Sequence, residues 1–224
     1  MLEELLTHHP VFTCLDPDSH KAVVRSAIPK RYQKGECIAC HAESWPYLFL
    51  VEMGTVQAIK ESAGRSLLVV EMDQGEIFWG VSFFIDNAPL PVALMAKAET
   101  SLYLWSLDDL KPIILNNGRM SWELTRLMIN KMQYASEILN EFAFQPITGR
   151  LARLLLDHFE DAVEDYVARD MTLDEMAARI GSTREMVCRH LYHFADQGAI
   201  LINRTELKIT DQTILKELVG KDTQ

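Results

Sequence analysis

The sequence contains no apolar run near the roughly 20 residues that a membrane-spanning helix needs. Only 4 of its 224 residues are cysteine, which does not suggest the disulfide framework of a small secreted protein. The acidic N-terminus, MLEELLTHHPVF, lacks the basic and apolar segments of a secretion signal. We therefore expect a soluble, cytoplasmic protein with no membrane partner.

Basic residues are also scarce, since 22 lysines and arginines face 32 aspartates and glutamates, for a net charge of −10. This balance argues against general coating of nucleic acid, so any DNA affinity has to come from a local cluster. Paired catalytic carboxylates, a nucleophile–base set and a phosphate-binding loop are all missing. The chain is therefore predicted not to be an enzyme.

Two short helical patterns are present on either side of Gly181. Thr172 and Glu175 have the spacing of a capping box, which predicts the start of the first helix. Gly181 suits the end of that helix, because glycine enters the left-handed region without steric cost. Ser182 or Thr183 can cap the second helix, so the segment predicts a helix-turn-helix.

The second helix carries Arg184, Glu185 and Arg189 on its outer, polar face. An arginine can bond two acceptors on a guanine edge, and a carboxylate can accept from a cytosine amino group. The alternative is an ordinary solvated face, in which Glu185 and Arg189 pair within the helix because they are four residues apart. The residues alone leave both interpretations open.

The first half of the chain predicts a helical lead-in over residues 1–30 and then a compact β barrel or roll from Tyr32 to about Leu107. Strands are predicted at Tyr47–Val51, Val56–Ile59, Leu67–Val70 and Leu102–Trp105. A long helix follows, from about Asp108 or Met120 to Phe144. Apolar residues at heptad spacing form a seam along this helix, and a second apolar face could pack on the roll. Two apolar faces need two partners, so the seam predicts a dimer. The seam consists of Met128, Met132, Ala135, Leu139 and Phe142.

Gln145–Pro146 interrupts the long helix, since proline disfavours helix in the residue before it. Beyond it the pattern predicts an amphipathic helix at Thr148–His158, a loop or frayed end at Glu160–Asp170, a β-hairpin around Asn203–Glu206 and a tail helix around Ile214–Leu218. A β-hairpin that follows the second helix of a helix-turn-helix, the reader helix, makes a winged helix. Arg204 and Lys208 of this hairpin could meet DNA phosphates. We predict a sensor domain at 1–110, a dimerisation helix at 111–145 and a DNA-binding domain at 146–224.

The ordered set of short motifs along the whole chain resembles the CRP/FNR family of bacterial transcription regulators, named for the cyclic-AMP receptor protein and the fumarate-nitrate regulator. The motifs are Lys34–Glu36, Gly54–Val56, Gly75–Glu76, Thr148–Ala152, Ile180–Glu185 and Val187–Arg189. The resemblance implies an α+β fold with a cyclic-nucleotide-binding-type β-roll, a long dimerisation helix and a winged helix-turn-helix. It also implies a homodimer that binds a palindromic double-stranded DNA operator, with RNA polymerase as a further partner.

By resemblance, Arg184, Glu185 and Arg189 fall on base-contacting positions of the family, for a GTGA-like half-site. Thr183 falls on a cap that also touches phosphate. Cys188 falls among these DNA-contacting positions at a place that is often small, so its thiol is interpreted as incidental.

The effector is left unidentified by the sequence. Family members that bind cyclic nucleotides hold the phosphate with an arginine after the Gly-Glu pair, yet no arginine or lysine occurs from Gly75 to Ala96. A buried phosphate without a cation would be heavily penalised, which argues against a cyclic nucleotide. The candidate effector pocket is either an apolar cavity, with haem as one hypothesis, or a filled core. Its residues are Gly75, Glu76, Phe78, Trp79, Phe83, Val92, Ala135 and Ser136.

Cys37, Cys40 and His41 form a Cys-x-x-Cys-His motif, which matches c-type haem attachment and could also hold zinc or iron. The favoured interpretation is an accidental motif of ordinary roll residues with no metal, because Ile38 should belong to the core. A redox-sensitive thiol pair is the leading alternative.

The predicted function is a sequence-specific DNA-binding transcription regulator, controlled at the β-roll by an unidentified effector or by a redox or gas signal. Two alternatives come from other classes. One is a haem or metal redox protein that uses the Cys37–His41 motif. The other is a ligand-binding module that regulates a protein partner.

Overall fold

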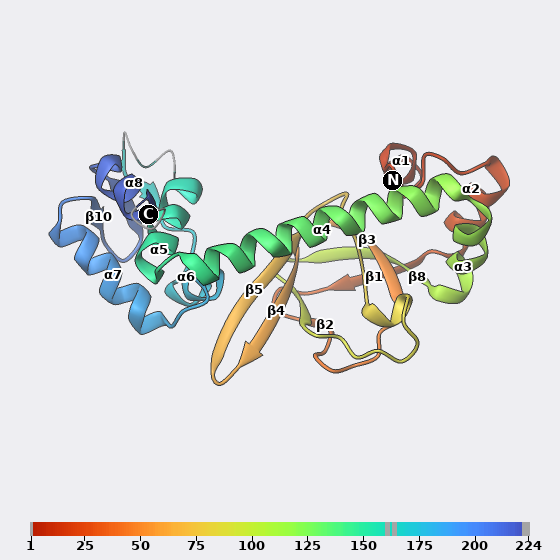
Figure 1. The fold of residues 1–224 in the computed structure, drawn as a ribbon. Helices are drawn as coiled ribbons and strands as arrows, with labels where there is room; N and C mark the ends of the chain where they lie inside the picture. Colours follow the sequence, from red (N-terminus) through yellow and green to blue (C-terminus); the bar gives the residue numbers. More distant parts are fainter. Residues whose placement is uncertain (1, 160–161, 163–164, 221–224) are drawn as a thin grey trace. The chain divides into compact units, whose positions relative to one another are not determined.

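A computed structural model describes residues 2–159, 162 and 165–220. The chain divides into two compact units (Figure 1). The first contains residues 1–60 and 69–133, and the second contains residues 61–68 and 134–224. Within the described ranges, none of the helices combines the length and apolarity needed to cross a membrane.

The first unit is built on two four-stranded sheets, except that residues 61–68, in a hairpin of the second sheet, are assigned to the second unit. The first has the order β1-β8-β3-β6, with antiparallel neighbours throughout, and the second has the order β2-β7-β4-β5. The strands of the first sheet are β1 (Ile28–Tyr32), β3 (Tyr47–Met53), β6 (Ile77–Trp79) and β8 (Thr100–Ser106). Those of the second are β2 (Cys37–Ala39), β4 (Val56–Ser62), β5 (Arg65–Met72) and β7 (Ala93–Ala96).

Strand β3 shows how the first unit organises its apolar residues. Successive side chains of a strand point to opposite faces. Phe49 and Val51 therefore enter the core that the strands of both sheets share, while Leu48 and Leu50 enter a second core. All four are fully buried, so the strand is covered on both faces.

Helices complete the second core. They are α1 (Leu2–His8), α2 (Pro17–Ser26), α3 (Leu107–Asn116) and the first part of α4 (Gly118–Phe144), with the short 3₁₀ helix η1 at Val81–Phe83. Leu6, Val23, Leu110 and Leu124 are their buried contributions. The start of α2 is set locally, because the carboxylate of Asp16 accepts from the backbone N–H groups of Asp18 and Ser19.

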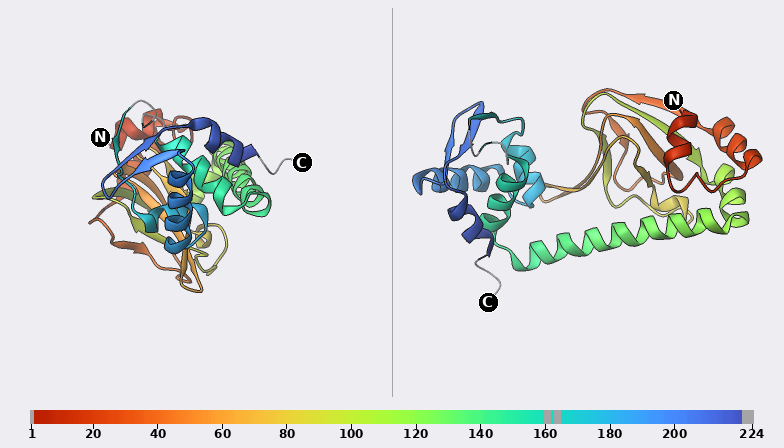
Figure 2. Two further views of the ribbon diagram at one scale, coloured as in Figure 1. Left: turned by 90° about the vertical axis from the view of Figure 1, so that its left-hand side faces the viewer. Right: turned by 90° about the horizontal axis from the view of Figure 1, so that it is seen from above.

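Of the two predicted starts of the long helix, the one near Met120 is confirmed, since α4 begins at Gly118 and Asp108 lies in the separate helix α3. Asn117 separates α3 from α4 with an extended backbone, and its side-chain oxygen accepts from the backbone N–H of Met120 at 3.0 Å. An asparagine that offers this bond favours a helix start over a continuous helix. From Gly118 to Phe144, α4 runs without interruption (Figure 2).

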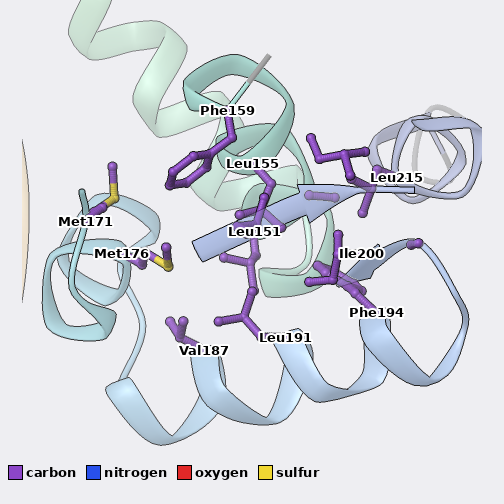
Figure 3. Packing of buried hydrophobic residues seen from close by; sticks show 14 of the residues in the cluster. Leu151, Leu155, Phe159, Met171, Met176, Val187, Leu191, Phe194, Ile200 and Leu215 are labelled. Carbon is purple, nitrogen blue, oxygen red and sulfur yellow. The ribbon is translucent and has the colours of Figure 1, made fainter. Parts of the chain in front are cut away.

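The second unit contains a winged helix-turn-helix. Its helices are α5 (Ile147–His158), α6 (Leu173–Ile180), α7 (Arg184–Asp196) and α8 (Gln212–Gly220), and its sheet has the order β10-β11-β9. The strands are β9 (Val167–Ala168), β10 (Ile200–Ile202) and β11 (Glu206–Ile209). Figure 3 shows Leu151 and Leu155 of α5 in one core with Met176 of α6 and Leu191 of α7.

Strand β9 corrects the prediction of a loop over residues 160–170. Val167 pairs with Leu207 of β11, so the end of that stretch joins the wing as a third strand. A strand of only two residues has no recognisable sequence pattern, and β9 forms only by pairing with a strand about 40 residues later in the chain. Positions 160, 161, 163 and 164 of the predicted loop lie outside the described residues.

Candidate nucleic-acid interface

Helix α6 has a start and an end that its own residues define. The Thr172 hydroxyl accepts from the backbone N–H of Glu175 at 3.2 Å, and the Glu175 carboxylate accepts from the backbone N–H of Thr172 at 2.7 Å. The reciprocal capping box is therefore present as predicted. Gly181 ends the helix with φ +62°, in the left-handed region that favours glycine.

Helix α7 begins at the cap supplied by Thr183, whose hydroxyl accepts from the backbone N–H of Met186 at 3.3 Å. Its apolar stripe of Val187, Leu191 and Phe194 is buried and faces α5 and the wing (Figure 3). Burial of this stripe fixes the rotation of the helix about its axis. The opposite face is consequently left in solvent.

The exposed face of α7 carries the predicted reader residues. Arg184 pairs with Asp174 of α6 at 3.4 Å, and Arg189 pairs with Glu185 at 3.0 Å. The arginine side chains are 67% and 64% exposed, respectively. Exposed ion pairs are worth only about 0–1 kcal/mol, so both guanidinium groups can exchange these partners for another acceptor at little cost. Cys188 is half-buried on the same helix.

Two further groups extend this face. Tyr192 is 66% exposed and lies three residues after Arg189 and seven after Glu185, which places it on the same side of the helix. His193 is also exposed. Burial lowers the pKa of the neighbouring His190, and nearby His193 and Arg189 lower it further. Tyr192 was not among the predicted reader residues, although its helical spacing from Glu185 is a signal that the sequence contains.

The turn between β10 and β11 is organised by Asn203. Its side-chain oxygen accepts from the backbone N–H groups of Thr205 at 2.9 Å and Glu206 at 2.8 Å. An asparagine bonded in this way mimics a backbone turn. Arg204 is exposed at the tip of this turn, on the wing predicted to meet phosphate.

Two residues near the wing, Tyr166 and Arg169, were not predicted because the sequence pattern placed them in the acidic loop. Arg169 donates from Nη2 to the backbone oxygen of Arg204 at 2.8 Å. The ammonium of Lys208 lies 6.0 Å from the centre of the exposed Tyr166 ring. Three basic residues therefore gather on the wing of a chain that is acidic as a whole.

The residues of the predicted effector pocket have several different environments. Phe78 and Val92 belong to the core shared by both sheets, while Trp79 and the fully buried Phe83 belong to the core beneath the helices. The carboxylate of Glu76 pairs with Lys131 of α4 at 3.3 Å. The aromatic residues thus contribute to two separate cores, and Glu76 is already paired with the ammonium group of Lys131.

The remaining pocket candidates line different cavities or none. Gly75 borders a cavity of about 530 Å³ together with Glu4, His8, His9 and Glu52. Ser136 borders one of about 450 Å³ in the second unit, lined also by Asn140, Glu141 and Arg153. Ala135 is exposed on α4.

The Cys-x-x-Cys-His motif lies at the end of β2. Ile38 belongs to the core, as expected, whereas Cys37, Cys40 and His41 are exposed. The Cys37 and Cys40 sulfurs are 3.1 Å apart. Among residues 2–159, 162 and 165–220, no group of three or more His, Cys, Asp or Glu side chains is placed to hold a metal ion.

Comparisons with known proteins agree with both parts of this fold. The family model of the cyclic nucleotide-binding domain matches residues 29–117, and that of the Crp-like helix-turn-helix domain matches residues 149–218. A CRP-like cAMP-activated global transcriptional regulator of Mycobacterium tuberculosis is 23% identical over 216 residues, covering 94% of this chain and 96% of that protein. The cAMP-activated global transcriptional regulator CRP of Salmonella typhimurium is 25% identical over 175 residues, covering 76% and 83%.

A solved structure of a protein assigned to the crp/fnr family, from Eubacterium rectale, has a TM-score of 0.79 at 19% identity. The match covers 94% of this chain and 98% of that one. This likeness confirms the predicted fold class, with a cyclic-nucleotide-binding-type domain, a long helix and a C-terminal helix-turn-helix. The curated relatives described above are transcription regulators rather than enzymes.

Proposed function

The chain belongs to the CRP/FNR family of DNA-binding transcription regulators, and from this premise we propose that it acts as a homodimer on a palindromic operator. In this proposal Arg184, Glu185 and Arg189 of each α7 read base edges in the major groove. Thr183, Arg204 and Lys208 contact the flanking phosphates. The protein would act in the bacterial cytoplasm, where its operator DNA is.

The exposed face of α7 is the observation that carries the proposal. A buried apolar stripe fixes the rotation of this helix, and its two arginines are held only by exposed ion pairs. A guanidinium presents planar donors that match the two acceptors of guanine, while the Glu185 carboxylate can accept from cytosine. Cys188 lies within this set without supplying a strong donor or acceptor.

The dimer is supported by the exposed seam of α4. Met132 and Leu139 are 66% and 69% exposed in the single chain, and Met128 and Ala135 are exposed as well. Burying one such large apolar side chain is worth about 1.5–3 kcal/mol. A second copy of α4 would bury the exposed part of the seam, from Met128 to Leu139, and bring two reader helices to one duplex. Phe142, the last residue of the predicted seam, packs instead against Gly181 of the same chain. Reader helices must lie roughly 34 Å apart to enter successive major grooves.

We propose that the effector is not a cyclic nucleotide, although the curated relatives are described as cAMP-activated. The segment from Gly75 to Ala96 contains no lysine or arginine, and Val92 in the expected phosphate-binding stretch is buried. A phosphate there would have no cationic partner from this segment. Control by another effector, or by a redox or gas signal at the roll, fits these residues better. RNA polymerase is the further partner that the family implies.

The proposal is tested by binding to duplexes with two GTGA-like half-sites in inverted orientation. Analytical ultracentrifugation with labelled DNA should show two chains per duplex. Moving the half-sites apart by about five base pairs, half a helical turn, should weaken binding strongly, because it rotates one site to the opposite side of the DNA. Equal affinity for both spacings, or one chain bound per duplex, would refute the palindromic dimer. Added cAMP or cGMP should leave the affinity unchanged.

A further inference from the structure

The two thiols of Cys37 and Cys40 lie against each other because of an irregularity in β2. Residues three apart on a regular strand point to opposite faces. Here Cys37 pairs with Met95 of β7 while Ala39 pairs with the adjacent Leu94, so the strand register shifts between them. Such a shift changes the direction in which later side chains point. The result is a Sγ–Sγ distance of 3.1 Å.

The pair is accessible to small reagents, since both cysteines are exposed. A disulfide requires an S–S distance of about 2.05 Å, so the sulfurs need to approach by only about 1 Å. The ring that the bond would close contains Ile38 and Ala39, both anchored in the core. The backbone N–H of Cys40 donates to the Glu43 carboxylate at 2.9 Å, which holds the second thiol close to the strand end.

We propose that Cys37 and Cys40 are a reversible modification site, which forms an intramolecular disulfide by exchange with a low-molecular-weight disulfide such as oxidised glutathione. The Cys40 thiolate attacks one sulfur of the reagent and releases the first glutathione thiolate. Cys37 then loses its proton and attacks the Cys40 sulfur, which releases the second. The protein loses two protons and two electrons, and the reagent gains them as two glutathione thiols.

This order of attack agrees with the surroundings of Cys37. The pKa of the Cys37 thiol is raised to about 11, mainly by partial burial and next by the hydrogen bond with Cys40. Since the thiolate is the attacking species, Cys37 is the poorer first nucleophile at neutral pH and suits the resolving step. The resolving step by Cys37 should therefore accelerate as the pH rises from 7 to 9.

The residues after the thiol pair contact both ends of the segment from Gly80 to Leu90. The backbone N–H of Ala42 donates to Leu90 O, and that of Leu90 donates to Glu43 O, both at 2.9 Å. At the other end, a Cβ on Gly80 would lie 1.9 Å from the carbonyl oxygen of Trp45, so the two backbones are in close contact. Closing the disulfide would move the start of the segment from Cys40 to Trp45. Through these contacts the movement would reach the segment from Gly80 to Leu90.

The segment from Gly80 to Leu90 lies in the stretch of the roll where the effector is expected. A change in DNA affinity on oxidation therefore rests on the function proposed above, whereas formation of the disulfide does not. The two steps can be measured separately on the same purified protein.

The first measurement treats the full-length protein with oxidised glutathione, blocks the remaining thiols by acid quench and alkylation, and analyses peptides by mass spectrometry. The peptide with Cys37 and Cys40 should be lighter by two hydrogen atoms and should escape alkylation, and dithiothreitol should reverse the change. Cys37→Ser and Cys40→Ser should instead retain one glutathione on the remaining thiol. Cys188→Ser is the matched control for this measurement and should form the same disulfide as the wild type. Lasting glutathione adducts on the wild-type pair, or unchanged thiols, would overturn the proposal.

The second measurement compares the affinity of the reduced and oxidised protein for operator DNA by fluorescence anisotropy. We expect at least about a fivefold difference, the lower end of typical coupling between sites, and no difference for the double variant Cys37→Ser/Cys40→Ser, which can form neither the disulfide nor an adduct at this site. A disulfide that forms without changing the affinity would refute its role in control. Failure of both forms to bind any operator DNA would contradict the proposed function instead, while the mass measurement still decides the disulfide.

Discussion

The ring of Phe142 occupies the space beside Gly181. An ideal Cβ on Gly181 would lie 2.8 Å from Phe142 Cε1, closer than real Cβ atoms come to neighbouring atoms. The same ring lies under the guanidinium of Arg150, whose Cζ is 4.5 Å from the ring centre. The end of α4 is thus packed directly against the turn of the helix-turn-helix and the start of α5.

Gly181→Ala should destabilise the second unit for two separable reasons. The left-handed backbone costs a residue with a Cβ about 1–2 kcal/mol, and the overlap with Phe142 adds to this. Gly198→Ala is the matched control, because Gly198 has φ +75° but no atom within 4 Å of its added Cβ. It should show the backbone cost alone. Chemical denaturation of both variants measures the difference.

A double-mutant cycle isolates the overlap. In a Phe142→Ala background, Gly181→Ala should cost less stability than it does in the wild type. Gly198→Ala should cost the same in both backgrounds. Additive losses for the Gly181 and Phe142 substitutions would mean that the ring does not crowd this turn.

Leu139→Lys should convert the dimer to monomers. Leu139 is largely exposed in the single chain, so a lysine there leaves the fold of each chain intact. In the dimer it would place two like charges in an apolar seam, where buried unpaired charge is costly. Asn130→Lys adds the same charge off the seam and should remain dimeric. Sedimentation velocity distinguishes the outcomes, and a dimeric Leu139→Lys protein would rule out this seam.

Arg204→Ala should weaken binding to all DNA sequences by a similar factor, because a phosphate contact carries no direct sequence information. The slope of log affinity against log salt should fall in magnitude by about 1. Arg25 is exposed on α2 of the first unit, so Arg25→Ala removes the same charge and should leave the slope unchanged. A loss confined to the operator would instead identify Arg204 as a base reader.

Stability of the first unit should fall as the pH is lowered from about 6.5 to 4. Burial lowers the pKa of His9 to about 4, whereas in the unfolded chain it returns towards 6.5. Between these values the unfolded state binds the extra proton, so the contribution of His9 is full above pH 6.5 and is lost towards pH 4.

Urea denaturation across this range checks the prediction. His9→Gln removes the titration while keeping an acceptor for the backbone N–H of Val11, which donates to His9 Nδ1 at 3.2 Å. The variant should show a flatter pH dependence than the wild type. Identical slopes would exclude His9 as their source.

The features that the sequence predicts correctly are those specified by neighbouring residues. The capping box of Thr172 and Glu175 and the left-handed Gly181 depend on chemistry within one or two turns, and the structure contains both. The apolar stripe of α7 likewise follows from helical period alone. Because that stripe is buried, the opposite side of α7, with Arg184, Glu185 and Arg189, is left exposed.

The features that the sequence does not predict depend on distant pairing. Strand β9 exists because Val167 meets Leu207, and the contact between Cys37 and Cys40 exists because β2 shifts register against β7. Strand alternation predicts opposite faces for the two thiols. Asn117 is different, since its capping side chain is a local signal that favours the second of the two predicted starts of the long helix.

Base reading by Arg184 is tested directly by the affinity of the protein for operator and random duplexes. Arg184→Ala should weaken operator binding by about 1–3 kcal/mol and leave binding to random DNA nearly unchanged, with Arg25→Ala as the charge-matched control. An equal loss on both duplexes would make Arg184 a phosphate contact and contradict sequence reading by this helix.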